Sequence, residues 1–208
     1  MAVAGEYRST HKPIACATIC DITLSLARTP AIQFHDRHDE EDWKVTLADI
    51  GEDSMTACRV KQIQRYIPAG ESFLLTCGDG LATIGINASI AAHKASGKVC
   101  TISAVHPAGR FGALRIEDYG RIQTFNEKPQ FEDTHVNGGY MVCSHRLLDY
   151  LPNDPGVMLE RKPMDDLARD GQLNAYKHEG FWQPMDTYQE AQYLNQLWNT
   201  GQAPWKIW

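Results

Sequence analysis

Two aspartates stand at the ends of apolar stretches, where a carboxylate can hold a metal ion. Asp79 follows the run 73–77 and precedes Gly80, and Asp186 ends the aromatic stretch 180–186. A carboxylate at a strand end followed by glycine places hard oxygen atoms in an open cleft, and two that converge would bind Mg²⁺ for a phosphate substrate. The alternatives are a Gly-Asp-Gly turn at Asp79 and a helix cap at Asp186, just before a helix predicted from Tyr188.

Polar residues that suit a sugar phosphate lie between the two aspartates in the sequence. Lys128 offers a point charge for one phosphate, and its neighbour Glu127 can accept hydrogen bonds from sugar hydroxyls. Asn137 offers a side-chain amide next to Gly138 and Gly139, which allow close backbone approach. A surface ion pair at Glu127 and Lys128 and a simple turn at Asn137 are the alternatives.

Cations recur where a nucleotide could be held. Arg59, Lys61 and Arg65 lie at spacings that place them near one face of a predicted helix, where they could gather a triphosphate. Solubility is the competing explanation, and we favour it for Lys61 and Arg65. Arg110 precedes Gly112, a position at which the backbone can come close to a ligand.

Composition bounds the class of protein. The chain has 208 residues, 43% of them hydrophobic and 22% charged, with a net charge of -6, which argues against nucleic-acid binding. Its apolar runs are too short to cross a membrane and its first residues lack the order of a signal peptide, so we expect a cytoplasmic protein. The six cysteines form no Cys-x-x-Cys pair, and Cys77, Cys100 and Cys143 lie in apolar runs, where we expect buried, reduced thiols.

Strands and helices alternate along most of the chain. Apolar patterning predicts one or two strands within 21–34 and further strands over 44–48, 72–76, 99–105, 139–143 and 173–177. A hairpin is predicted around residues 118–120. Helical spacing covers 59–66, 87–94, 146–150, 158–169 and 188–200, with Asn87 as a cap and Gly97 as a stop. This order predicts a mixed α/β sheet with a small β-hairpin insert.

Taken together, the motifs resemble those of the glucose-1-phosphate cytidylyltransferases, which belong to the sugar-nucleotide pyrophosphorylases. The resemblance runs from about residue 43 to the end of the chain. It rests on Cys77-Gly-Asp-Gly80, Gly109-Arg-Phe-Gly-Ala-Leu114, Phe125-Asn-Glu-Lys-Pro129, Asn137-Gly-Gly139, Gly180-Phe-Trp-Gln-Pro-Met-Asp-Thr187 and the tail Ala203-Pro-Trp-Lys-Ile-Trp208. It implies one nucleotidyltransferase-like domain over 1–208, in which 1–42 matches poorly, with a Rossmann-like sheet covered by helices on both faces.

The resemblance also implies an activity. The family transfers a cytidylyl group from CTP to glucose 1-phosphate, releasing pyrophosphate and forming CDP-glucose for deoxysugar and O-antigen synthesis. Such enzymes form homo-oligomers and use Mg²⁺. Site residues are implied motif by motif: Asp79 and Asp186 for the metal, Lys128 for the sugar phosphate, Glu127 and Asn137 for the glucose, Arg59 for the triphosphate, and Arg110 and Gly112 for substrate.

The N-terminal segment departs from the family pattern. A strand and a glycine-rich loop of the Gly-Gly-x-Gly-Thr-Arg kind are expected there, but residues 1–8 carry a single glycine. Loss of the central strand should leave the neighbouring strand with an unpaired edge. Three hypotheses stay open: an active cytidylyltransferase, a non-catalytic remnant or assembly subunit, and a chain whose true start lies upstream.

Overall fold

The structure is a computed structural model that describes residues 2–4, 22–25, 31–34, 46–107, 113–126 and 134–207. The chain divides into two compact units, residues 1–7 with 50–205 and residues 8–49 with 206–208. In the second unit, β2 (Ile22–Ser25) and β3 (Ala31–Phe34) form an antiparallel pair, as the sequence predicts for 21–34. Among the described residues, no helix has the length and apolar character needed to cross a membrane.

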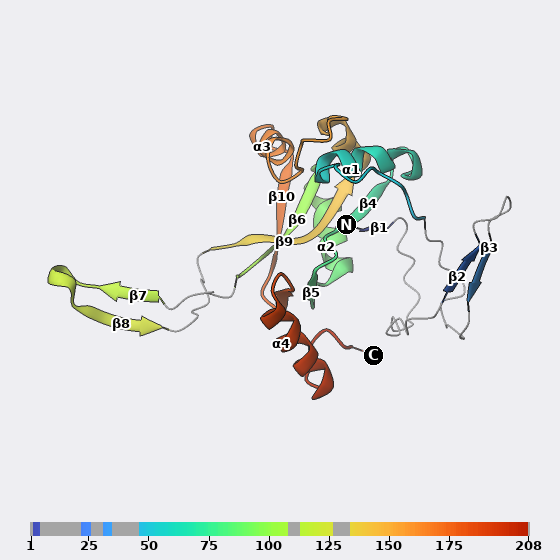
Figure 1. Ribbon diagram of the computed structural model, residues 1–208. Coiled ribbons are helices and arrows are strands. Elements are labelled where there is room, and N and C mark those ends of the chain that lie inside the picture. The colour runs from blue at the N-terminus through green and yellow to red at the C-terminus, as the bar shows by residue number, and fades with distance from the viewer. Residues whose placement is uncertain are drawn as a thin grey trace. The chain divides into compact units, whose positions relative to one another are not determined.

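The larger unit is built on a five-stranded mixed sheet (Figure 1). Its strand order is β1 (Ala2–Ala4), β4 (Ser72–Thr76), β9 (Val136–Ser144), β6 (Cys100–Val105) and β10 (Leu173–His178). β9 is antiparallel to both β4 and β6, and β10 is parallel to β6. β4, β6 and β10 therefore run in the same direction, and β1 pairs antiparallel with the outer edge of β4.

Helices cover both faces of this sheet, as predicted. α1 (Thr56–Gln62), the 3₁₀ segments η1 (Ile63–Tyr66) and η3 (His145–Tyr150) and α3 (Lys162–Arg169) accompany one face, and α2 (Ile86–Ser96) packs on the other. Successive side chains of β6 point to opposite faces of the sheet. Cys100 belongs to the main core, whereas Thr101 contacts His93 of α2 on the other face. Two short pairs complete the unit, β5 (Gly80–Ala82) with β11 (Trp182–Pro184) and β7 (Ala113–Ile116) with β8 (Ile122–Asn126), followed by the helix α4 (Tyr188–Asn199).

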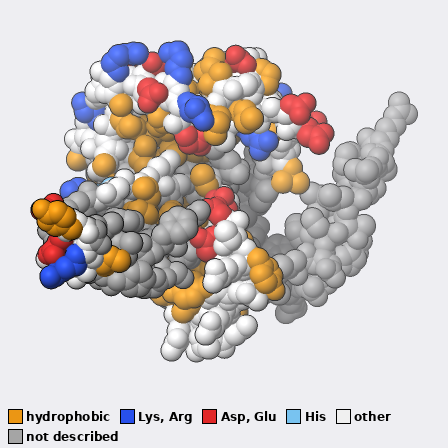
Figure 2. All heavy atoms as spheres, turned by 60° about the vertical axis from the view of Figure 1, so that its left-hand side comes forward, with side chains coloured by type: hydrophobic (Ala, Val, Ile, Leu, Met, Phe, Trp, Pro, Cys, Tyr) orange, Lys and Arg blue, Asp and Glu red, His pale blue; other side chains and the backbone are white. Residues whose placement is uncertain are grey.

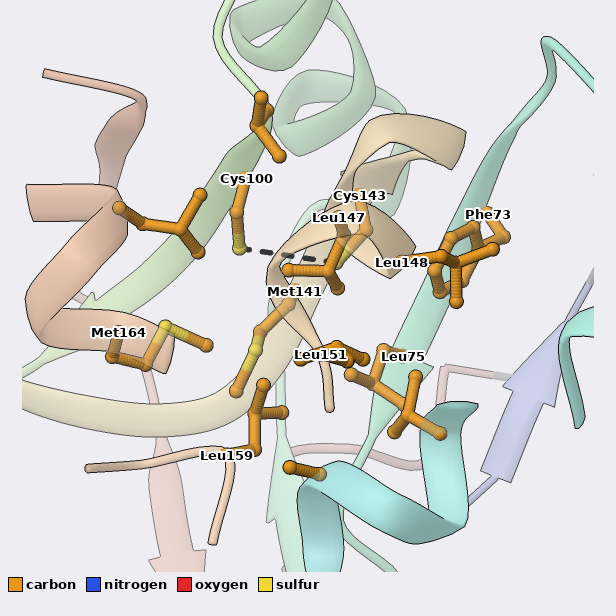
Figure 3. Packing of buried hydrophobic residues seen from close by; sticks show 14 of the residues in the cluster. Phe73, Leu75, Cys100, Met141, Cys143, Leu147, Leu148, Leu151, Leu159 and Met164 are labelled. Atoms are coloured by element: carbon orange, nitrogen blue, oxygen red, sulfur yellow. Dashed lines mark hydrogen bonds between the residues drawn. The ribbon is translucent and has the colours of Figure 1, made fainter. Parts of the chain in front are cut away.

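The main core lies between the sheet and the layer that contains α1, η3 and α3. Figure 3 shows Phe73 and Leu75 of β4 and Met141 of β9 packed with side chains from these helical segments. Leu147 and Leu159 are fully buried there. Cys100 and Cys143 are paired across β6 and β9, with their Sγ atoms 3.8 Å apart as free thiols. The hydrogen bond with Cys100, and then burial, raise the pKa of Cys143, so this thiol stays protonated.

Several predicted elements are confirmed with shifted boundaries. β4 spans the predicted residues, Gly97 ends α2 in the left-handed conformation, and the hairpin β7–β8 is present. Helix α3 begins at Lys162 rather than 158, with Pro163 in its first turn, where the missing N–H of proline costs nothing. Cys77 is only partly buried, unlike Cys100 and Cys143.

Two local predictions are wrong. Of the strand predicted over 44–48, residues 46–48 are described and form no strand, and Leu47 is 84% exposed. No strand in the described part of the chain pairs with them, and an unpaired strand is not stable in water. Asn87 does not cap α2. The helix begins at Ile86, with Gly85 in the cap position and no side-chain cap, and Ser89 N–H donates to Gly85 O.

Burial of His93 predicts a loss of stability in mild acid. Desolvation lowers the pKa of His93, so the folded protein holds it neutral, next to Thr101 Oγ1 at 3.1 Å, while the unfolded chain takes up a proton near its ordinary pKa of 6.5. Neutral His93 therefore costs the folded protein no stability above about pH 6.5. As the pH falls below this value, proton uptake by the unfolded chain lowers the free energy of unfolding. In urea unfolding at pH 7.5 and 5.5, we expect His93→Asn to lose less stability on acidification than the wild type. Equal losses in the two proteins would contradict this assignment.

Candidate active site

The strand directions bring several loop residues to one edge of the sheet. Because β4, β6 and β10 are parallel and β9 opposes them, the carboxyl ends of three strands meet the beginning of β9. Asp79 follows β4, and Asn137 lies at the beginning of β9. In open α/β sheets, ligands bind beyond this edge. The candidate active site therefore lies at the carboxyl edge of β4 and β6.

A two-stranded ribbon connects the two aspartates. Gly80 of β5 is paired with Pro184 of β11, and beyond this pair the N–H of Met185 donates to Asp79 O at 2.7 Å. Asp186 is the next residue along the chain. Two acidic residues that are distant in the sequence thus lie at the same end of the β5–β11 ribbon, and both are exposed.

The helix cap next to Asp186 is made by other residues. Thr187 is the N-cap of α4, and its hydroxyl accepts from Glu190 N–H while the Glu190 carboxylate accepts from Thr187 N–H. This is a complete capping box, so the carboxylate of Asp186 is not the capping group. Asp186 itself is exposed to solvent, although it follows the aromatic residues Phe181 and Trp182.

Two aromatic side chains bind the ribbon to β9 through their polar tips. Trp182 Nε1–H donates to Gly138 O at 2.9 Å, and the Tyr140 hydroxyl donates to Gly80 O at 2.5 Å. Burial, and then the negative charge of Asp79, raise the pKa of Tyr140, so the phenol keeps its proton at neutral pH and remains a donor. Sequence reasoning missed Tyr140 as a positioning residue, because its partner is a backbone carbonyl on another strand.

The first residues of β9 form a compact irregularity in the pairing with β6. Asn137 Oδ1 accepts from Gly139 N–H at 2.9 Å, and Gly139 has a φ of 80°, a conformation that favours glycine. A Cβ at Gly138 would lie 2.8 Å from Val105 Cγ1, so only glycine fits there. Gly139 O accepts from Cys77 N–H at 2.9 Å, and this bond connects the start of β9 to the segment that leads into Asp79. The interpretation of Asn137 as a turn before a strand is wrong, because Asn137 lies within β9 and is paired with Ala104 of β6. Its side-chain oxygen has a local partner in Gly139 N–H.

Negative charge gathers near the end of β4. Partial burial, followed by the charges of Asp79 and Glu160, raises the pKa of Cys77, so this thiol is not a thiolate nucleophile at neutral pH. Asp79 and Asp186 lie at the same end of the β5–β11 ribbon, and two carboxylates that converged there would favour a cation between them. Their hard oxygen atoms suit Mg²⁺, so the donor set fits the metal that the family resemblance implies.

At the other end of the β5–β11 ribbon, Thr83 contacts Phe181 and His178. Thr83 N–H donates to Phe181 O at 2.9 Å, and Thr83 Oγ1 lies 3.4 Å from His178 Nε2. Phe181 also packs against Trp205, with ring centroids 5.4 Å apart. The two aromatic motifs that the sequence singles out, in 180–187 and in 203–208, are therefore in contact, and this contact helps to position the ribbon.

The remaining predicted site residues are placed as follows. Arg59 lies on α1, and its Nε–H donates to Ser54 O at 2.5 Å, within the same segment. Its role toward a triphosphate stays a prediction. Arg110, Gly112, Glu127 and Lys128 lie outside the described residues. Figure 2 shows Lys and Arg side chains gathered at the top of the view, with Asp and Glu side chains among them, at the end where Figure 1 shows α1 and α3.

The fold is similar to that of solved structures. A Bacillus anthracis protein described as a glucose-1-phosphate thymidylyltransferase aligns with 73% of this chain at 15% identity and a TM-score of 0.53. The chain spans 62% of that structure's length. At this identity the likeness concerns the fold alone, which is the Rossmann-like α/β fold of nucleotidyltransferases.

Sequence comparison gives the family. The model described as nucleotidyl transferase matches residues 9–183, and the chain belongs to this family. It is 44% identical over 188 residues to the glucose-1-phosphate cytidylyltransferase of Salmonella typhi, an alignment that covers 90% of this chain and 72% of the relative. The enzyme of the same description from Salmonella typhimurium matches equally well, at 44% identity with the same coverage. The family match extends into the segment 1–42.

Close packing at Gly180 predicts that this position accepts no side chain. A Cβ there would lie 2.6 Å from Thr83 Oγ1 and 2.7 Å from His178 Cε1. We expect Gly180→Ala to lower the free energy of unfolding by about 1–3 kcal/mol, measured by urea denaturation. The matched control is Gly78→Ala, because a Cβ at Gly78 meets no atom within 4 Å. Equal stability of the two variants would contradict the packing argument.

Proposed function

We propose that this chain transfers the cytidylyl group of CTP to glucose 1-phosphate, releasing pyrophosphate and forming CDP-glucose. The observation that carries the proposal is the hydrogen bond from Met185 N–H to Asp79 O, which brings two exposed aspartates to one ribbon end at the carboxyl edge of the sheet. The 44% identity to glucose-1-phosphate cytidylyltransferases supports the choice of nucleotide and sugar.

The proposed reaction is one in-line displacement. A phosphate oxygen of glucose 1-phosphate attacks the α-phosphorus of CTP, a new P–O bond forms, and the bond to the β-phosphate oxygen breaks as pyrophosphate leaves. No covalent intermediate with the protein is needed. The chain contributes by holding two polyanions in line, which converts a bimolecular reaction into one between neighbours.

Asp79 and Asp186 would hold Mg²⁺, which when bound neutralises charge on the phosphates. The ribbon contacts of Tyr140 and Trp182 keep the two aspartates in position, so these aromatic residues act as positioning residues. Lys128 would bind the sugar phosphate, and Glu127 and Asn137 the glucose hydroxyls. Arg59, Arg110 and Gly112 would contact the nucleotide.

We further propose that the protein acts in the cytoplasm as a homo-oligomer, in the synthesis of nucleotide sugars for deoxysugars and O-antigen. Analytical ultracentrifugation of the full chain tests the oligomer. We expect a single species larger than the monomer, and a monodisperse monomer would contradict this part of the proposal.

Removing either carboxylate charge should abolish turnover. We expect Asp79→Asn and Asp186→Asn each to reduce pyrophosphate release from CTP and glucose 1-phosphate by about 100-fold or more, since charge stabilisation by a bound metal is worth several kcal/mol. Excess EDTA should have the same effect, and Mg²⁺ should reverse it.

The matched control is Asp165→Asn, an exposed aspartate on α3. We expect this variant to keep wild-type activity. No pyrophosphate release by the wild type, together with retained binding of glucose 1-phosphate in calorimetry, would instead favour the non-catalytic remnant. Activity that survives in both aspartate variants would refute the assigned site.

A further inference from the structure

Three residues with metal-binding side chains occupy one rung of the central sheet, just beyond its last paired residues. Val105 of β6 is paired with Val136 of β9 and with His178 of β10. One step further lie His106, His135 and Glu179. Side chains at one rung of a sheet point to the same face, and neighbouring strands are about 4.8 Å apart. The register therefore places two imidazoles and a carboxylate side by side.

The side-chain atoms are close enough to share a ligand. His106, His135 and Glu179 each offer one ligand atom, and these atoms lie within 4.8 Å of one another. His106 Nε2 is 3.1 Å from Glu179 Oε2, and the rings of His106 and His135 have centroids 4.1 Å apart. Ligand atoms on a tetrahedral metal are about 3.4 Å apart, so small side-chain rotations would complete the set.

The backbone selects the nitrogen of His106 that faces the cluster. His106 Nδ1 lies 3.3 Å from Thr134 O, and a carbonyl can only accept, so Nδ1 carries the hydrogen. In neutral His106, Nε2 then presents a lone pair to the Glu179 carboxylate. Two acceptors at this distance can both serve as ligands of one cation. A metal-binding histidine commonly has its other nitrogen bonded to a carbonyl in this way.

His135 adds a nitrogen without a hydrogen-bond partner to the cluster. Its Nε2 is buried and has no hydrogen-bond partner in the described part of the chain. A buried polar nitrogen without a partner is costly, and coordination of a cation would remove that cost.

We propose that His106, His135 and Glu179 bind one zinc ion, separate from the pair Asp79 and Asp186. Two imidazole nitrogens and one carboxylate oxygen form a donor set that suits Zn²⁺ and leaves a fourth position for water. The Glu179 side chain is 68% exposed, which gives the ion a path from solvent, whereas the His106 side chain is only 12% exposed. The bound ion joins the ends of β6 and β10 to the start of β9.

Zinc affinity tests the proposal without reference to catalysis. The full-length chain is stripped of metal, kept reduced, and titrated with Zn²⁺ in competition with a chromophoric chelator. We expect His135→Gln and Glu179→Gln to lose one tight zinc equivalent, with affinity reduced at least about tenfold. Glu179→Gln changes an exposed side chain, so it keeps the test valid even if His135→Gln fails to fold, as checked by circular dichroism.

The matched control is His145→Gln, which removes a histidine on η3 outside the cluster and should leave zinc binding unchanged. Co²⁺ supplies a second readout, because a nitrogen and oxygen site gives visible absorption bands without thiolate charge transfer. Zinc affinity and stoichiometry that are the same in the wild type and in both cluster variants would overturn the proposal and leave an ion pair between His106 and Glu179.

Discussion

The direction of β9 is the constraint on which the rest of the structure depends. This strand is hydrogen-bonded on both sides, to β4 and to β6, and it runs opposite to both. The carboxyl ends of β4 and β6 therefore meet the start of β9 at one edge. Met141 and Cys143 of β9 are buried in the core, so a slip by one residue would turn them to the opposite face. Core packing thus determines which residues stand at the functional edge.

Backbone contacts, rather than contacts between charged side chains, hold the candidate active site. The Tyr140 hydroxyl donates to Gly80 O, and Trp182 Nε1–H donates to Gly138 O; each is the only polar group of its side chain. Glycine is needed at Gly138 because the neighbouring strand leaves no room for a Cβ. The two aspartates can then remain exposed to solvent while the ribbon that carries them stays in register. Positioning residues and proposed ligands are consequently different residues.

The edge offers two donor sets of different chemistry. Asp79 and Asp186 offer hard carboxylate oxygens, which suit Mg²⁺ and phosphate. His106 and His135 offer imidazole nitrogens, which suit borderline cations. Asp79 follows β4 whereas His106 follows β6, and β9 lies between these two strands in the sheet. The chemical type of the ligand atoms therefore determines which of the two proposed cations binds at each site.

The sequence by itself determined the local elements and the family. The continuous apolar run of β4, the hairpin β7–β8 and the left-handed stop at Gly97 follow from patterns of a few residues, and each is present. Local patterns failed at two places. Residues 46–48 pair with no strand among the described residues, and α2 begins at Ile86, before the predicted cap Asn87.

Tertiary structure alone decided which side chains meet. The sequence singled out Asp79 and Asp186 separately, but only the pairing of β5 with β11 brought them to one ribbon end. His106, His135 and Glu179 carry no recognisable spacing, because their proximity depends on the register between three strands. Register is set by long-range packing of the core, and this information is not contained in any short segment of the chain.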